Sequence, residues 1–108
     1  HYGGEWPDNE ATTISSKQVS GQPFSEAFHN FAVEWEAEAI RFKIDGDVKK
    51  EVSGWWTPDS EWPAPFDKAF TAVINLNVGG QWPGPPDVTT PFPAVLRVDS
   101  IRVWGNAA

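Results

Sequence analysis

The stretch FAVEWEAEAIRFKIDGDVKKEV, residues 31–52, decides the fold class of this 108-residue chain. Apolar and polar residues alternate along residues 31–35 and again along 40–44, which is the pattern of a β-strand buried on one face. The sequence Asp-Gly-Asp at 45–47 is typical of a tight turn, and 48–52 follows as another short strand, so the region predicts a β-hairpin. Glutamate and alanine between the first two stretches also suit a turn of helix, but the alternation on both sides favours strands.

Two further strands are expected in the second half of the chain. Residues 70–78 alternate most regularly, and residues 96–104 form a last strand. Residues 53–67 and 79–93 carry most of the prolines and are expected to be long ordered loops. Regularly spaced strands with turn signals and no convincing long helix predict an all-β chain, folded as an antiparallel β-sandwich with residues 1–108 in a single domain.

The charge balance and the cysteine count exclude several classes of protein. Eight Lys and Arg residues stand against 15 Asp and Glu residues, which gives a net charge of −7. This sign argues against nucleic acid or an anionic membrane as a partner, because phosphates need a surplus of basic side chains. The absence of cysteine excludes a disulfide scaffold and a thiolate metal site. No apolar run approaches the ~20 residues that span a bilayer, so no membrane segment is expected.

Aromatic and amide side chains are the candidates for a binding site, since the chain holds seven Trp and seven Phe. Asn75 and Asn77 project from one face of the strand predicted over 70–78, where burial without a partner would cost each amide about 1–3 kcal/mol. The loop that follows places Trp82 between glycines and a proline, which suits a flat ring that stacks on a sugar while the amides bind its hydroxyls. A solvated strand face is the simpler alternative for the two amides. Trp6, between a Gly-Gly pair and a proline, is the second candidate platform.

Candidate catalytic groups are few. Glu34, Glu36 and Glu38 occupy alternate positions, which suggests the carboxylate pair of a glycosidase. A solvated acidic edge is the favoured interpretation, because three equivalent acids offer no separate acid and base. His1 and His29 are the only imidazoles, and neither has a second histidine at metal-ligand spacing. The residues alone therefore predict a carbohydrate-binding β-sandwich and no catalytic residue.

Five ordered blocks carry a resemblance to a known family. They are FHNFAVEW at 28–35, IRFKIDG at 40–46, PFDKAF at 65–70, INLNVGGQWPG at 74–84 and VDSIRVW at 98–104. Together they resemble glycoside hydrolase family 16, and most of all its laminarinases, which are endo-β-1,3-glucanases, with the insect-type β-glucan recognition proteins nearby. The resemblance implies a jelly roll of the concanavalin A-like kind, with two curved antiparallel sheets and the substrate cleft on the concave face. It also implies a secreted, retaining enzyme that acts on β-1,3-glucan.

The family's catalytic strand, E-I-D-I-x-E or a close variant, lies upstream of the block that begins with HYGG at residues 1–4. No E-x-D-x-x-E occurs in this chain. The resemblance therefore implies the C-terminal half of a laminarinase, with an N-terminal companion segment that completes the fold and supplies the catalytic carboxylates. The alternative from another class is a non-catalytic β-glucan-binding protein, and a generic lectin-like sandwich is a third interpretation.

The resemblance also implies roles for individual residues. The implied substrate-binding positions are His1, Trp6, Asn75, Asn77 and Trp82. Among them, His1 matches a histidine that neighbours the catalytic carboxylates. Asp99 matches an aspartate that binds a structural calcium ion in many members, with the other ligands near the N-terminus of the full domain. The implied chemistry requires no cofactor.

Overall fold

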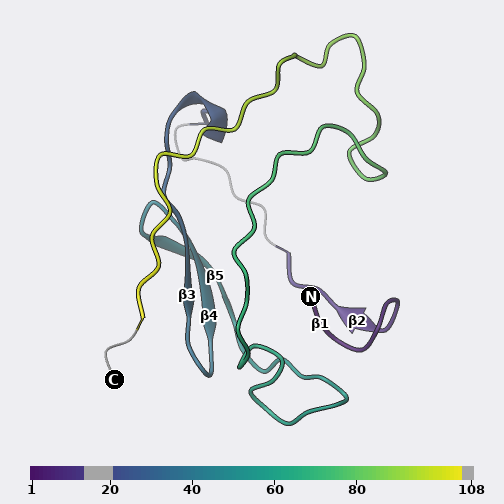
Figure 1. The fold of residues 1–108 in the computed structure, drawn as a ribbon, viewed down its shortest axis with the longest axis vertical. Coiled ribbons are helices and arrows are strands. Elements are labelled where there is room, and N and C mark those ends of the chain that lie inside the picture. The colour runs from purple at the N-terminus through teal and green to yellow at the C-terminus, as the bar shows by residue number, and fades with distance from the viewer. Residues whose placement is uncertain (14–20, 106–108) are drawn as a thin grey trace. The chain divides into compact units, whose positions relative to one another are not determined.

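The computed structural model describes residues 1–13 and 21–105 (Figure 1). The chain divides into two compact units, residues 1–70 and residues 71–108. All regular strands in the described residues pair antiparallel, which confirms the all-β prediction. A single-turn 3-10 helix, η1 (Phe24–Glu26), is the one helical element among them. No helix in the described part of the chain is long and apolar enough to cross a membrane.

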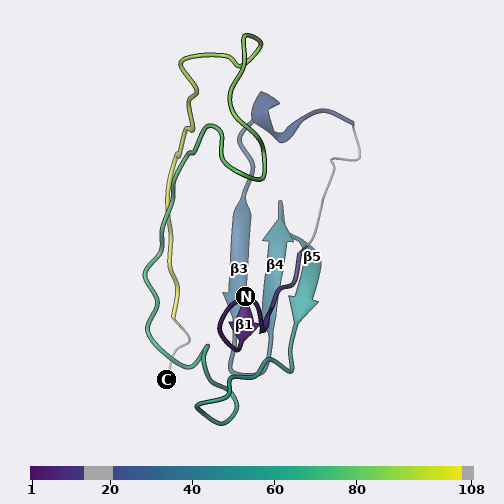
Figure 2. The same cartoon turned by 90° about the vertical axis from the view of Figure 1, so that its right-hand side faces the viewer.

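The centre of the first unit is a three-stranded sheet in the order β3-β4-β5 (Figure 2). Its strands are β3 (Phe31–Trp35), β4 (Ile40–Ile44) and β5 (Asp47–Val52), as the alternation predicts. The turn between β4 and β5 holds Asp45 and Gly46 at φ angles of 51° and 88°. Positive φ at both central residues is what a two-residue hairpin turn matched to the strand twist requires.

The two faces of this sheet differ in chemistry, because residues paired across neighbouring strands share a face. One face is apolar. On it Phe31 pairs with Ile44, Val33 pairs with Phe42, and Trp35 pairs with Ile40, which in turn pairs with Val52 on the other side. Glu34 pairs with Arg41 and Arg41 with Glu51, so the other face is charged. The apolar face stays largely open in this unit, since Phe31 is 65% and Val33 58% exposed.

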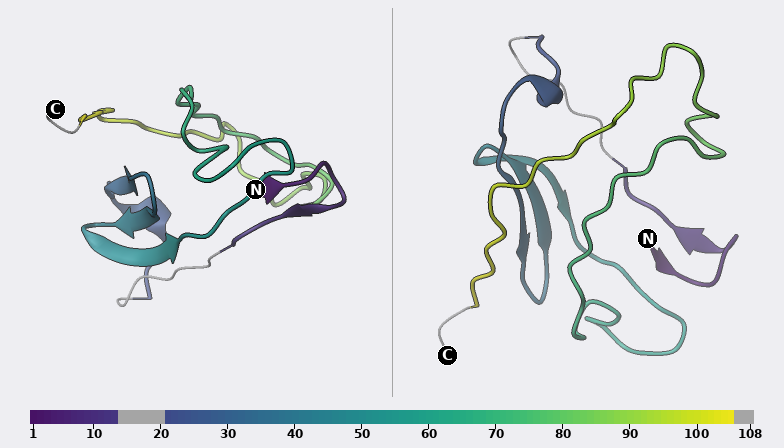
Figure 3. Two further views of the ribbon diagram at one scale, coloured as in Figure 1. Left: turned by 90° about the horizontal axis from the view of Figure 1, so that it is seen from below. Right: turned by 45° about the horizontal axis from the view of Figure 1, so that its top comes forward.

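A short N-terminal ribbon (residues 1–10) is an element that the alternation did not predict. It is formed by β1 (Tyr2–Gly3) and β2 (Asn9–Glu10), which pair Tyr2 with Glu10 and Gly3 with Asn9 (Figure 3). Strands of two residues are too short to show a period in the sequence. The ribbon matters below because it forms one wall of a groove.

The loop after β5 is ordered by an aromatic column. Trp55 is 2% exposed, and its indole Nε1 donates a hydrogen bond to the Pro63 carbonyl at 2.7 Å. Its ring stacks on Trp62 at 4.6 Å between centroids and meets Phe66 edge-on at 5.1 Å. The ring centroids of Phe66 and Phe70 lie 5.9 Å apart, so neighbouring rings contact one another all the way from Trp62 to Phe70. The prediction of a long ordered loop over 53–67 is confirmed, since residues 53–67 hold no regular strand and only the isolated bridge between residues 57 and 60.

The strands predicted over 70–78 and 96–104 are wrong for this structure. Described residues 71–105 contain no regular strand, and their one bridge joins Gly80 to Gly84 in the predicted loop. Alternation reports which side chains suit a half-buried sheet, but a strand also needs a neighbour that completes its ladder of backbone hydrogen bonds. The assignment of residues 1–108 to a single domain stays a prediction.

Candidate functional site

A groove of about 280 Å³ lies beside the N-terminal ribbon. It is lined by His1, Tyr2, Gly3, Gly4, Asn9, Thr57 and Pro65. The first five belong to the ribbon and the last two to the loop after β5, so the groove has two walls from segments far apart in sequence. Its volume is slightly below the roughly 300–1,000 Å³ of small-molecule sites, which suits a ligand portion of one ring.

His1 is held in place within the ribbon wall. The side-chain amide Nδ2 of Asn9 donates to Nδ1 of His1 at 3.2 Å. Because Nδ1 accepts this hydrogen bond, the neutral ring carries its proton on Nε2. His1 therefore presents a hydrogen-bond donor at the exposed end of the ribbon.

Trp56 joins the two walls. The backbone N–H of Gly3 donates to the Trp56 carbonyl at 2.9 Å, and a Cβ atom on Gly3 would lie only 3.0 Å from the indole carbon Cζ2. Gly3 also has φ of +91°, a region that side-chain-bearing residues rarely adopt. Only glycine lets the ribbon lie this close to the indole ring.

Glu10 connects the same parts through its side chain. Indole Nε1 of Trp56 donates to Oε1 of Glu10 at 3.1 Å. Tyr2 is the register partner of Glu10, and interaction with this carboxylate raises the pKa of Tyr2, first through hydrogen bonding that favours the neutral phenol and then, together with desolvation, through its charge. The carboxylate thus lies between Tyr2 in the ribbon wall and Trp56, which precedes Thr57 of the loop wall.

Trp6 lies at the turn of the ribbon, where the Asp8 N–H donates to the Glu5 carbonyl at 2.7 Å. Its side chain is 85% exposed, and Pro7 follows it directly. An exposed flat ring on a closed turn suits stacking on a sugar, as the sequence predicts.

The other predicted binding residues belong to the second unit. Asn75 and Asn77 are exposed, and Trp82 is 96% exposed within the turn that the Gly80–Gly84 bridge closes. Gly79, just before this turn, has φ of +83°, and a Cβ there would lie 2.9 Å from Pro86 Cδ. The structure brings His1 and Trp6 into one ribbon and places the other three in residues 71–105, and their shared role stays a prediction.

Asp99 is exposed and stands in no cluster of ligands. Across residues 1–13 and 21–105, no three or more His, Cys, Asp or Glu side chains form a group that could hold a metal ion. A calcium ion takes about six to eight oxygen ligands. Because calcium also accepts backbone carbonyl oxygens and water, the calcium role of Asp99 stays a prediction.

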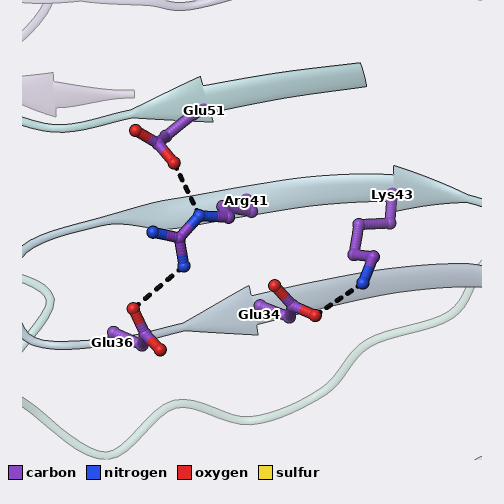
Figure 4. A network of polar contacts seen from close by, with 5 residues as sticks. All are labelled: Glu34, Glu36, Arg41, Lys43 and Glu51. Carbon is purple, nitrogen blue, oxygen red and sulfur yellow. Dashed lines mark hydrogen bonds and ion pairs between the residues drawn. The ribbon is translucent and has the colours of Figure 1, made fainter. Parts of the chain in front are cut away.

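The three glutamates that suggested a catalytic pair do not form one. Only Glu34 lies in a strand, and Lys43 Nζ binds its Oε1 at 2.6 Å and lowers its pKa (Figure 4). Arg41 binds Glu36 Oε2 through Nη1 at 2.9 Å and Glu51 Oε2 through Nε at 2.5 Å. These carboxylates are engaged on an open sheet face, which supports the interpretation of a solvated acidic edge.

His29 also has a structural partner. Its Nδ1 lies 2.6 Å from Oδ2 of Asp45, whose Oδ1 accepts the Asn30 backbone N–H at 2.9 Å. Phe24 meets the imidazole edge-on at 5.1 Å. The histidine therefore ties the start of β3 to the β4–β5 turn, far from the groove in sequence.

Sequence reasoning missed the residues that build the groove around His1. Glu10, Trp56, Thr57 and Pro65 carried no assigned role, because their contacts join segments some 46 residues apart. The usable signal was the Gly-Gly pair at residues 3–4, since adjacent glycines often allow a close approach to a ring.

The antiparallel sheet, the exposed aromatic side chains and the small groove with an imidazole and an amide together describe a β-sheet protein with a candidate binding surface. The family model "Glycosyl hydrolases family 16" matches residues 6–92. The chain therefore belongs to glycoside hydrolase family 16, whose fold is the β-jelly roll.

Several proteins are similar to the chain. Glucan endo-1,3-beta-glucosidase A1 of Niallia circulans is 33% identical over 96% of this chain and 16% of its own length. Beta-glucanase of Rhodothermus marinus is 37% identical over 71% of this chain and 28% of its own length. Beta-1,3-glucan-binding protein 1 of Manduca sexta is 26% identical over 80% of this chain and 21% of its own length. The chain thus spans less than a third of each of these relatives, and no solved structure matches it significantly.

Proposed function

We propose that this chain forms part of the substrate cleft of a secreted, laminarinase-like endo-β-1,3-glucanase. The observation that carries the proposal is the groove beside His1, in a chain of a glycosidase family whose similar proteins include a glucan endo-1,3-beta-glucosidase. In this role His1 and Trp6 bind sugar from the N-terminal ribbon. Asn75, Asn77 and Trp82 bind sugar from residues 71–105.

The hydrolytic carboxylates belong to a companion segment in this proposal. A retaining glycosidase needs two carboxyl groups about 5–5.5 Å apart. Glu34, Glu36 and Glu51 are held in ion pairs and Glu10 binds Trp56, and no E-x-D-x-x-E occurs in the sequence. The open apolar face of the β3-β4-β5 sheet supports the same conclusion, since a jelly roll covers that face with a second sheet. A structural calcium at Asp99 would equally depend on ligands from elsewhere.

Calorimetric titration of the natural protein containing this chain with laminarin, cellohexaose and dextran tests the binding role. Thr57→Tyr fills the groove, and Thr12→Tyr adds the same side chain at an exposed position outside it. We expect saturable binding of laminarin by the wild type and by Thr12→Tyr, with a loss of several-fold in Thr57→Tyr. Absence of laminarin binding in the wild type refutes the proposal.

A non-catalytic β-glucan-binding protein is the second candidate, favoured by the absent E-x-D-x-x-E and by the glucan-binding protein among the similar sequences. The natural protein containing this chain separates the two functions when it is incubated with laminarin. New reducing ends that keep the β configuration by NMR indicate the retaining enzyme. Binding without new reducing ends indicates the binding protein.

A further inference from the structure

The two walls of the groove differ in how firmly they are fixed. The loop wall rests on Trp55, which is 2% exposed, stacked on Trp62 and hydrogen-bonded to the Pro63 carbonyl. A side chain so enclosed cannot shift without breaking several contacts at once. Trp56 follows directly in the chain, so its backbone is anchored by its neighbour.

The ribbon wall has fewer restraints. Its strands are two residues long, and an isolated two-stranded ribbon is marginal in water. What attaches it to the loop is one backbone hydrogen bond from Gly3, the contact of Gly3 with the Trp56 ring, and the carboxylate of Glu10. Of these three attachments, only that of Glu10 is made by a side chain of the ribbon. The same carboxylate also interacts with Tyr2.

Glu10 itself is exposed and does not line the groove. Its hydrogen bond to Trp56 Nε1 spans 46 residues of sequence, and its register partner in the ribbon is Tyr2. Since Tyr2 lines the groove and Thr57 follows Trp56, the two side chains beside the carboxylate lie in or next to opposite walls.

We infer that Glu10 is the positioning residue of this groove: its carboxylate holds the ribbon against the loop and so fixes the groove width for one sugar ring of a β-1,3-glucan. The inference rests on the proposed function for the identity of the ligand, and on the hydrogen bonds of Glu10 for the mechanism. Glu10 does not touch the sugar. It acts through Tyr2 and Trp56.

Three variants test the inference in the natural protein that contains this chain. Glu10→Ala removes the acceptor, Glu10→Gln keeps an acceptor oxygen at the same reach, and Glu5→Ala removes a carboxylate from the same ribbon outside the groove. Far-UV circular dichroism checks that each variant folds. Trp56→Phe assigns the indole N–H signal of Trp56 in the ¹H–¹⁵N spectrum.

The first readout needs no ligand. We expect the nuclear Overhauser contact between the Gly3 Hα protons and the Trp56 ring to persist in the wild type, Glu10→Gln and Glu5→Ala, and to weaken strongly in Glu10→Ala. The Trp56 indole N–H should exchange faster with solvent in Glu10→Ala alone. A contact and an exchange rate that are unchanged in Glu10→Ala overturn the inference whether or not the chain binds glucan.

The second readout is the affinity for laminaritriose. We expect Glu10→Ala to weaken binding about five- to tenfold, on the scale of one net hydrogen bond, with Glu10→Gln and Glu5→Ala near the wild type. Equal losses of affinity in Glu10→Gln and Glu10→Ala overturn the role of the acceptor oxygen. An unchanged affinity in Glu10→Ala overturns the claim that Glu10 sets the groove width for the ligand. A wild type that binds no glucan refutes the proposed function, and the ligand-free readout still decides whether Glu10 positions the ribbon.

Discussion

Replacement of Trp55 by phenylalanine should destabilise the first unit far more than the same change at its stacking partner Trp62. Trp55 is 2% exposed, whereas Trp62 is 45% exposed. A buried tryptophan removes about 150–250 Å² from water, which at about 25 cal/mol per Å² corresponds to roughly 4–6 kcal/mol. Complete truncation to alanine would therefore consume much of the roughly 5–15 kcal/mol that stabilises a typical domain, so phenylalanine is the sharper probe.

Trp55→Phe keeps a stacked ring but removes the indole donor to the Pro63 carbonyl and part of the buried area. The lost hydrogen bond contributes about 1 kcal/mol and the cavity a similar amount, for a total of about 2 kcal/mol. With a urea m-value of about 2 kcal/mol/M, the midpoint should fall by about 1 M.

Urea unfolding followed by near-UV circular dichroism measures both midpoints on the same chain. Trp62→Phe should shift the midpoint by half as much or less, because almost half of that side chain already contacts water. Equal shifts in the two variants would refute the reasoning, since the aromatic column would then not be centred on Trp55.

Three further predictions concern single contacts. His29 holds the pKa of Asp45 below its ordinary value, so this stabilisation is complete above an unfolded-state pKa of about 4 and is lost as the pH falls through the lower folded-state pKa. The thermal stabilities of wild type and Asp45→Asn should therefore begin to converge as the pH falls below about 4 and meet only below the folded-state pKa; a constant difference contradicts the assignment. Gly3→Ala should destabilise the ribbon by about 1 kcal/mol or more, because the new Cβ meets Trp56 at 3.0 Å in a positive-φ conformation; an unchanged melting temperature and unchanged indole N–H signal of Trp56 argue against that contact. Trp82→Ala should lower laminarin affinity several-fold with no change in circular dichroism, because the side chain is 96% exposed; equal affinity by calorimetry removes Trp82 from the site.

Local patterns in the sequence were enough to predict the β3-β4-β5 sheet. Its strands are neighbours along the chain, and the Asp-Gly turn fixes the register between β4 and β5. The segments at 70–78 and 96–104 carry equally good alternation, yet they have no ladder partner in the described residues and are not strands. Alternation reports the burial that a segment suits, whereas a strand depends on a neighbour that the segment itself does not contain.

The candidate site was predicted in part for the same reason. Trp6 was proposed from the glycines and the proline beside it and His1 from the family resemblance, and their binding role stays a prediction. Glu10 and Trp56 carry no chemical signal in isolation, because one looks like a surface carboxylate and the other like one more loop tryptophan. Their roles come from a hydrogen bond that crosses 46 residues, which no local window contains.

The adjacent tryptophans at 55 and 56 have a consequence for protein engineering. Trp55 belongs to the packing of its own loop, while Trp56 is fitted to the ribbon through Gly3 and Glu10. A chimera that imports residues 53–66 from another member of the family would place a different indole against a ribbon that did not evolve with it. Exchange of residues 1–10 together with residues 53–66 keeps the Trp56 indole donor, the Glu10 acceptor and Gly3 from the same parent protein. These two segments are therefore the natural unit for recombination between relatives.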